Sequence, residues 1–331
     1  MTPETRQTLT TILQTQWWKR QINIAWATEA LEHLVRHARR HVPFYRDNGR
    51  LDRVFDSEDR FVMANWRRIP VLSRAEAYIH ADSLRAETLA ESIHPLEGVL
   101  TRGATGPALE IILSRRAQVM SDAQVLRAAS WHGFDWTYPS ARSQIYDDAR
   151  MQDGFTKAGN PLAAPEDAAF GVDVDISPEK QIEVLRIGRP HIIITWPSLV
   201  LAWIACDGGE SLRPTHSLIL SGETLTPEIR ARIAGAYTGR IIDVYATAET
   251  GPIAAQSPDG LMKVCEENVW LEDPVSNFDR DRPKPIVVTP LHGHAMPLIR
   301  YAPGDVAIFD GVRDPETPSL RCLRSIARAN G

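Results

Sequence analysis

The segment LILSGETLTPEIRARIAGAYTGRIIDVYATAETG, residues 218–251, alternates between two kinds of pattern. Its runs 218–220 and 241–245 are short and apolar, which is typical of buried strands. Between them, Thr226 is followed by a proline at the first helical position, so the sequence predicts a helix over 227–237. A strand, a helix and a second strand in this order favour an α/β layered fold.

The alternation continues on the amino-terminal side of this segment. Three further apolar runs predict strands, at 109–113, 143–146 and 192–194. A helix is predicted over 117–131, and the Gly-, Pro-, Ala- and Asp-rich run 150–180 is predicted as a long loop with a helix near Pro178. The apolar run 191–206 is interrupted by Trp196-Pro197-Ser198 and is too short to span a bilayer. We expect a buried strand there that leads into a helix.

The two ends of the chain differ in pattern. Residues 1–95 are predicted to be mainly helical, with an apolar stripe over 24–40 that ends before Pro43. Ser73-Arg74-Ala75-Glu76 matches a capping box, so a helix should begin after Ser73. Residues 260–310 change to strand patterns, at 269–271, 285–289 and 306–309.

These patterns predict an α/β fold of layered αβαβα sub-domains with a small β-barrel or sheet. The chain has 331 residues, 43% of them hydrophobic, which suffices for a large core. We predict three parts: a helical region at 1–95, an α/β sub-domain at 96–240, and an α/β plus β-rich sub-domain at 241–331.

Charge and cysteine content exclude several classes of protein. A net charge of −5, from 37 basic and 42 acidic residues, creates no large field that attracts nucleic acid. Cys206, Cys265 and Cys322 have no metal-ligand spacing, and we expect Cys206 and Cys265 to be small core residues. The sequence therefore predicts no zinc, no disulfide framework, no signal peptide over residues 1–16 and no membrane association, which indicates a cytoplasmic protein.

Glycine- and acid-bearing segments stand in a fixed order along the chain. They are TRGATGP at 101–107, SGE at 221–223, YATAETG at 245–251 and RYAPGD at 300–305. Together they resemble the nucleotide-binding signatures of the adenylate-forming (acyl-CoA synthetase, ANL) superfamily, in its phenylacetate-CoA ligase and capsule-protein branch. The resemblance implies the fold of the large N-terminal domain of these enzymes. It also implies ATP, Mg²⁺ and the adenylation of a carboxylic acid to acyl-AMP and pyrophosphate.

The resemblance assigns a role to individual residues. Glu249 supports Mg²⁺, Thr105 is catalytic with Glu249, and Asp305 accepts the ribose hydroxyls. The residues implied to contact phosphate are Thr101, Gly103, Thr105 and Gly106, and those implied around the adenine and α-phosphate are Ser221, Gly222, Glu223, Tyr245, Ala246 and Thr247.

Each segment also has a purely structural interpretation. Residues 101–107 fit a hairpin turn, and 221–223 fit a strand-to-helix turn. Glu249 fits an acid at a helix N-terminus, and Pro303-Gly304 fits a type II turn that leaves Asp305 solvated.

The resemblance also indicates the acid and the fate of its adenylate. Members of this branch in antibiotic pathways, including phenazine biosynthesis, act on planar aromatic acids, and Trp131, Trp136, Tyr138 and Trp196 are candidates for an aromatic pocket or for core packing. His132 is either a carboxylate ligand or a helix-end cap. In the superfamily a C-terminal lid domain follows the ribose aspartate, and 306–331 is too short for one. We therefore expect a lid-less enzyme that passes its acyl-adenylate to a partner enzyme.

Two other functions stay open at this stage. The residues at 102, 104, 107 and 248 differ from the superfamily pattern, which favours a degenerate, non-catalytic protein that binds an acid or nucleotide. An acyl-protein synthetase that loads its own cysteine would use Cys322. A homodimer is compatible with the sequence, which does not fix the oligomeric state.

Overall fold

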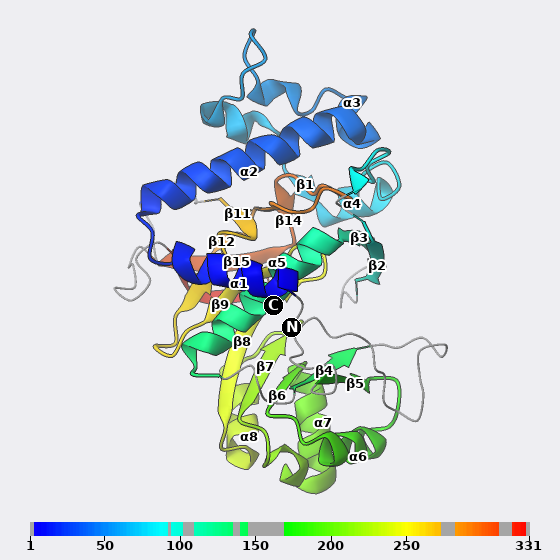
Figure 1. Cartoon of the computed structure of the whole chain (residues 1–331), viewed down its shortest axis with the longest axis vertical. Helices are drawn as coiled ribbons and strands as arrows, with labels where there is room; N and C mark the ends of the chain where they lie inside the picture. The colour runs from blue at the N-terminus through cyan, green and yellow to red at the C-terminus, as the bar shows by residue number, and fades with distance from the viewer. Residues whose placement is uncertain are drawn as a thin grey trace. The chain divides into compact units, whose positions relative to one another are not determined.

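The computed structural model describes residues 3–91, 94–101, 109–134, 140–144, 169–272, 282–310 and 320–328 (Figure 1). The chain forms two compact units. The first comprises Met1–Thr10, Val125–Tyr245 and Ala255–Gly260, and the second comprises Thr11–Gln124, Ala246–Ala254 and Leu261–Gly331. Helices and sheets are mixed along the chain, which confirms the predicted α/β class.

The first unit contains a parallel sheet with the strand order β5-β4-β6-β7-β8. Its strands are β4 Ser140–Gln144, β5 Ala169–Asp173, β6 Ile192–Thr195, β7 Ser217–Ser221 and β8 Arg240–Thr247. Its helices are α6 Pro178–Gly188, α7 Pro197–Asp207 and α8 Pro227–Ala236, with the short 3₁₀ helix η5 Glu210–Leu212. The order of strands and helices matches the β-α-β pattern from which the fold was predicted.

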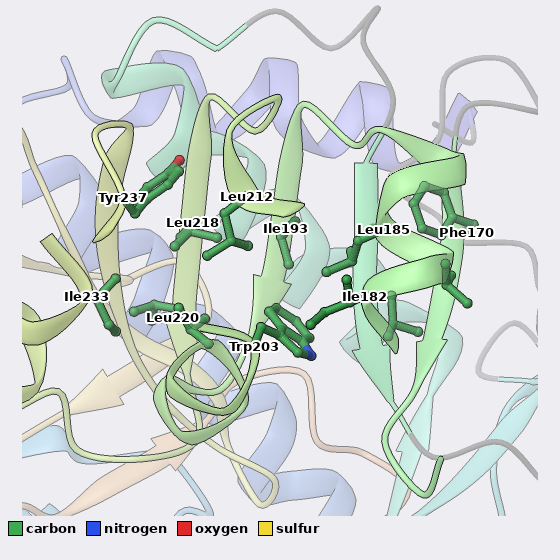
Figure 2. Packing of buried hydrophobic residues seen from close by; sticks show 14 residues of the cluster. Phe170, Ile182, Leu185, Ile193, Trp203, Leu212, Leu218, Leu220, Ile233 and Tyr237 are labelled. Atoms are coloured by element: carbon green, nitrogen blue, oxygen red, sulfur yellow. The ribbon is translucent and has the colours of Figure 1, made fainter. Parts of the chain in front are cut away.

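The core of this unit is built around Trp203 of α7 (Figure 2). The indole is fully buried, with Ile182 and Leu185 of α6 on one side and Leu220 and Ile233 on the other. Its Nε1 donates to Gln181 Oε1 at 2.7 Å, so the buried indole N–H is satisfied. This packing fixes α6 and α7 against the sheet whose carboxyl ends carry the candidate site.

The second unit contains helices and small sheets. The helices assigned wholly or partly to it are α1 Pro3–Thr15, α2 Arg20–His41, α3 Pro43–Arg46, α4 Arg74–Ile79 and α5 Arg115–Trp131, with the 3₁₀ helices η1 Asp52–Val54 and η2 Met63–Arg68. One sheet has the order β1-β14-β13-β11, another contains β12-β15-β16-β10, and β2 and β3 form an antiparallel pair. The bounds are β1 Leu72–Ser73, β2 Leu96–Leu100, β3 Glu110–Ser114, β9 Gly251–Gln256, β10 Met262–Val264, β11 Val269–Leu271, β12 Lys284–Pro285, β13 Val288–Pro290, β14 Tyr301–Ala302, β15 Asp305–Asp310 and β16 Cys322–Arg328.

Local signals in the sequence agree with the structure at several points. Ser73 caps α4, because its side chain accepts a hydrogen bond from the Glu76 N–H at 3.1 Å. The helix α2 ends at His41, before Pro43, and Pro43 itself begins α3. Cys265 is buried as expected.

Other expectations are corrected by the structure. Cys206 is exposed rather than in the core, because it lies in the last turn of α7 outside the buried positions of that helix, with its Sγ 3.6 Å from Glu179 Oε1 of α6. The predicted loop 150–180 contains the strand β5 in its described part, and the predicted strand 285–289 is divided between β12 and β13. Within the described ranges, no helix is long and apolar enough to cross a membrane.

Candidate functional site

In the first unit, three predicted segments lie at the carboxyl ends of parallel strands. Trp196 directly follows β6, Ser221 is the last residue of β7 and is followed by Gly222 and Glu223, and Tyr245 is in the last part of β8. The chain leaves β4 toward β5 on one side and leaves β6 toward β7 on the other, so the strand order reverses between β4 and β6. Ligands of open α/β sheets bind at the carboxyl ends of strands at such a reversal.

Two buried hydroxyl groups also lie near the carboxyl ends of the parallel strands. Ser143 of β4 and Thr195 of β6 directly follow the register pair Arg142 and Ile194. Their side-chain oxygens are buried and have no hydrogen-bond partner in the part of the chain that the structure describes. A buried hydroxyl usually has a partner, so both are candidates to contact a ligand. The sequence reasoning missed them, because a single Ser or Thr in an apolar run carries no signal of its own.

Gly222 and Trp196, which were predicted separately, are brought into contact. Gly222 has φ +82°, a conformation that other residues adopt only at a cost. A Cβ added there would lie 2.5 Å from Nε1 of Trp196, so the position has no room for a side chain. The turn predicted to contact adenine and the tryptophan predicted to line the acyl pocket are therefore in direct contact.

Glu223 fastens this turn to the helix that follows Trp196. Its carboxylate accepts from the Ser198 N–H at 2.9 Å and from the Ser198 hydroxyl at 2.6 Å. Ser198 is in the first turn of α7, where free N–H groups and the helix dipole favour an anion. The carboxylate thus caps α7 from a neighbouring loop.

The strand that carries Tyr245, β8, is braced from α8 near its start. Arg230 donates to the carbonyl of Ile241 at 3.1 Å and to Gln256 Oε1 at 2.6 Å. Two residues before Tyr245, burial raises the pKa of Asp243 to about 6, and the nearby Arg230 opposes this rise. These contacts fix the strand that carries Tyr245.

His132 and Trp131 lie at the end of α5 in the first unit. The His132 ring is buried, and its Nε2 is 2.9 Å from the Gln256 carbonyl oxygen, to which it donates. The Trp131 ring lies under the guanidinium of Arg127, whose Cζ is 5.4 Å from the ring centroid. His132 therefore braces the backbone through Nε2 rather than presenting that atom to a substrate.

Glu249 is the centre of a second cluster, in the second unit. It lies in the turn 248–250 between β8 and β9, so the interpretation as a helix N-terminal acid is wrong. Its side chain is only 3% exposed. Oε1 accepts from Arg74 Nη1 at 2.6 Å and from the Tyr301 hydroxyl at 3.1 Å.

The same arginine joins Glu249 to Thr101. Arg74 Nη2 donates to Thr101 Oγ1 at 3.2 Å, and that oxygen also accepts from the Leu109 N–H at 2.8 Å. Thr101 follows β2, whose antiparallel pairing with β3 agrees with the hairpin interpretation. The predicted residues Gly103, Thr105 and Gly106 lie outside the described residues, as do Trp136 and Tyr138.

Asp305 begins β15 after a tight turn. Gly304 has φ +89°, as the third residue of a type II turn requires. The Asp305 side chain is buried rather than solvated, and its Oδ1 lies 3.5 Å from Arg328 Nε. Nearby in the sequence, Arg300 forms a buried bidentate pair with Glu272, at 2.6 and 2.8 Å, and has a structural role.

The Glu249 carboxylate fits a magnesium site that includes substrate phosphates. Glu249 Oε2 has no hydrogen-bond partner among the described residues, whereas Oε1 has two. Mg²⁺ is usually held by one or two carboxylates together with waters and substrate phosphates. No group of three His, Cys, Asp or Glu side chains within the described ranges is arranged to hold a metal alone. A metal here would need the phosphates of a bound nucleotide.

Comparisons with known proteins place the fold. No protein-family model matches the sequence, and neither does any curated protein. The open conformation of 2-hydroxyisobutyryl-CoA ligase with 2-HIB-AMP and CoA matches with TM-score 0.68 and 17% identity, over 89% of this chain and 72% of that chain. The thioesterification state of that ligase gives TM-score 0.74 and 18% identity, over 95% and 69%. Its postadenylation state with R3-HIB-AMP gives 0.72 and 18%, over 92% and 67%.

These similarities confirm the fold prediction. The chain has a fold like the N-terminal domain of acyl-CoA synthetases.

Proposed function

We propose that this protein uses ATP and Mg²⁺ to adenylate a carboxylic acid. One observation carries the proposal: Arg74 joins Glu249, the predicted magnesium ligand, to Thr101, the first residue of the predicted phosphate segment. The two residues were assigned from motifs far apart in the sequence, and in the second unit they form one polar cluster. The acyl-CoA synthetase-like fold supports the same chemistry.

In the proposed reaction, a carboxylate oxygen of the acid attacks the α-phosphorus of ATP. The bond from that phosphorus to the bridging oxygen breaks, and pyrophosphate leaves with the electron pair. The roles proposed in the second unit are phosphate contact for Thr101 with Gly103, Thr105 and Gly106, metal binding for Glu249, and ribose binding for Asp305. In the first unit, Ser221, Gly222, Glu223 and Tyr245 frame the adenine, and Ala246 and Thr247 follow them in the chain.

We further propose that the acid is aromatic. The Trp196 indole is half-buried and packs on Gly222 at the carboxyl edge of the sheet, where its flat face suits a planar ring. Phenazine carboxylates are the first candidates, in keeping with the phenylacetate-CoA ligase branch and an antibiotic pathway. The acyl-adenylate would pass to a partner enzyme, because an activated acid needs an acceptor.

The test is acid-dependent exchange of labelled pyrophosphate into ATP with Mg²⁺. It is run against phenazine carboxylates, other aromatic acids, amino acids and fatty acids. Exchange with one acid class is expected, and Glu249→Ala should lower it by roughly a hundredfold or more, since metal neutralisation of phosphate charge is worth several kcal/mol. Asp305→Ala should raise the KM for ATP. The control Glu29→Ala, on the exposed side of α2, should exchange like wild type.

A second candidate function is supported by the same ion pair. Because Arg74 already neutralises Glu249, the chain is also compatible with a non-catalytic protein that binds an acid or nucleotide. Exchange separates the two: measurable ATP binding with no exchange for any acid would favour the binding role. The self-acylating interpretation loses support, since Cys322 is buried in β16.

A further inference from the structure

The Arg74 side chain has more hydrogen-bond donors than its described partners use. An arginine has five N–H donors in a planar fork. Nη1 donates to Glu249 and Nη2 to Thr101, and the guanidinium also interacts with the Tyr301 hydroxyl, so two of the five N–H groups have no partner among the described residues. The side chain is 23% exposed, which leaves it accessible.

Another arginine of the same unit shows the contrasting case. Arg300 uses all three of its nitrogens, because it donates to both carboxylate oxygens of Glu272 and to the carbonyls of Arg67 and Ile69. A guanidinium saturated in this way holds the fold together. Arg74 is only partly saturated, so its remaining donors are available to a ligand.

The charges of the cluster restrict which ligand fits. The charges of Arg74 and Glu249 cancel in their ion pair, and the Tyr301 hydroxyl donates to the same carboxylate oxygen. A bare polyphosphate would meet Glu249 as a like charge. A magnesium complex would not, because Glu249 Oε2 is available to the metal while the free donors of Arg74 are available to phosphate oxygens.

We propose that Arg74 binds the phosphate oxygens of a magnesium polyphosphate, ATP or pyrophosphate, held in front of Glu249 and Thr101. The proposal rests on the proposed function and adds a ligand-binding residue from α4, which none of the signature segments contains. Arginine suits this task because its fork binds two oxygens at once.

The experiment is calorimetric titration with inorganic pyrophosphate, with Mg²⁺ and with EDTA. Wild type should bind the magnesium complex and bind metal-free pyrophosphate much more weakly. Arg74→Gln should weaken binding of the magnesium complex roughly tenfold to a hundredfold, as expected for lost charge-assisted hydrogen bonds.

The Glu249→Gln variant gives the sharper result. It removes the like charge and leaves Arg74 unneutralised, so metal-free pyrophosphate should bind at least about tenfold more tightly than to wild type. The double variant Arg74→Gln/Glu249→Gln should lose that gain. A purely structural role for Arg74 would not produce this pattern of charge and metal dependence.

Glu76→Gln is the matched control. Glu76 is on α4, two residues from Arg74, and pairs with Arg50 at 2.5 Å, so the substitution makes the same charge change as Glu249→Gln and also breaks an arginine–glutamate pair of the same unit. It should leave both titrations unchanged. Removing Arg74 alone leaves a buried charge uncompensated and can unfold the chain. The double variant then carries the test, since it does not leave Glu249 charged and unpaired.

The outcomes separate this inference from the proposed function. If Arg74→Gln binds the magnesium complex as tightly as wild type, or if the double variant keeps the gain of Glu249→Gln where Arg74→Gln does not fold, the inference is overturned even where exchange is observed. The same holds if Glu249→Gln does not improve metal-free binding. If the pattern appears but no acid supports exchange, the inference stands and the adenylation proposal fails.

Discussion

Single residues at the candidate site are constrained by space as well as by chemistry. Gly222 must adopt φ +82°, and the indole of Trp196 fills the position that a Cβ would occupy. Glu249 and Thr101 are constrained in another way, because each is tied to the same guanidinium. Substitution at these positions therefore tests local geometry directly.

Gly222→Ala should destabilise the first unit more than a positive φ alone explains. The left-handed conformation costs about 1 kcal/mol with a Cβ, and the contact with Trp196 should add roughly 1–3 kcal/mol. Gly208→Ala is the matched control, because Gly208 has φ +69° and nothing within 4 Å of an added Cβ. Urea unfolding followed by tryptophan fluorescence compares the two variants. Equal losses of stability would show that Trp196 moves aside without cost.

At the scale of elements, the carboxyl-edge turns of the first unit are held by contacts with neighbouring helices. Glu223, in the turn after β7, accepts two hydrogen bonds from Ser198 at the start of α7. At the opposite end of β8, Arg230 of α8 donates to the carbonyl of Ile241, the second residue of the strand. The turn after one strand thus depends on the helix after another.

Glu223→Ala should lower the free energy of unfolding by about 1 kcal/mol, as the loss of a helix cap does. Glu223→Gln should lose less, because the amide oxygen still accepts one bond. Ser198→Ala removes only the hydroxyl donor, so a double-mutant cycle between the two positions should give a coupling of about 0.5 kcal/mol or more. Chemical denaturation measures each value, and a coupling near zero would mean that water replaces the contact.

The elements that the sequence predicts are those with strong local signals. The runs at 192–194, 218–220 and 241–245 are apolar and bounded by turns or caps, and all three are strands. The strand β5 is short, contains Gly171 and ends in an aspartate, so only its parallel pairing with β4 makes it a strand. β16 likewise depends on its pairing with β15.

At the candidate site, too, the sequence predicts the residues that belong to motifs and misses a contact that only the tertiary fold creates. Glu249 and Thr101 were found from motifs, whereas Arg74 was identified only as part of a capping box. Its partner Glu249 is 175 positions away in the sequence, so the contact is created by the tertiary fold. The described part of the phosphate segment is Thr101 alone, and the roles assigned to Gly103, Thr105 and Gly106 stay predictions.

At the scale of the whole molecule, the two units contain buried groups that respond to pH in opposite directions. In the second unit, burial lowers the pKa of His292 to about 4 and that of His294 to about 4. Both side chains are therefore neutral in the folded unit at physiological pH. In the first unit, burial raises the pKa of Asp243 to about 6.

Whether each group stabilises or destabilises its unit on acidification depends on the difference between its folded and unfolded pKa values. An unfolded histidine has a pKa of about 6.5, so below that pH the unfolded state binds protons that the folded second unit does not. The contribution of the two histidines to the stability of the second unit is therefore complete above pH 6.5. It falls by about 1.4 kcal/mol per pH unit for each histidine down to about pH 4. The buried Asp243 behaves oppositely, because its proton is lost more easily in the unfolded state. Its contribution rises as pH falls from about 6 toward the ordinary aspartate value.

Acidification from pH 7 to pH 5 should therefore weaken the second unit and strengthen the first. The expected changes are about 2 kcal/mol lost for each histidine and about 1 kcal/mol gained from Asp243. Peptide-resolved hydrogen exchange, corrected for the intrinsic pH dependence of exchange, reports each unit separately. His292→Gln with His294→Gln should flatten the loss in the second unit, and Asp243→Asn should abolish the gain in the first. Parallel changes in both units, unaffected by these substitutions, would mean that other groups control the pH response.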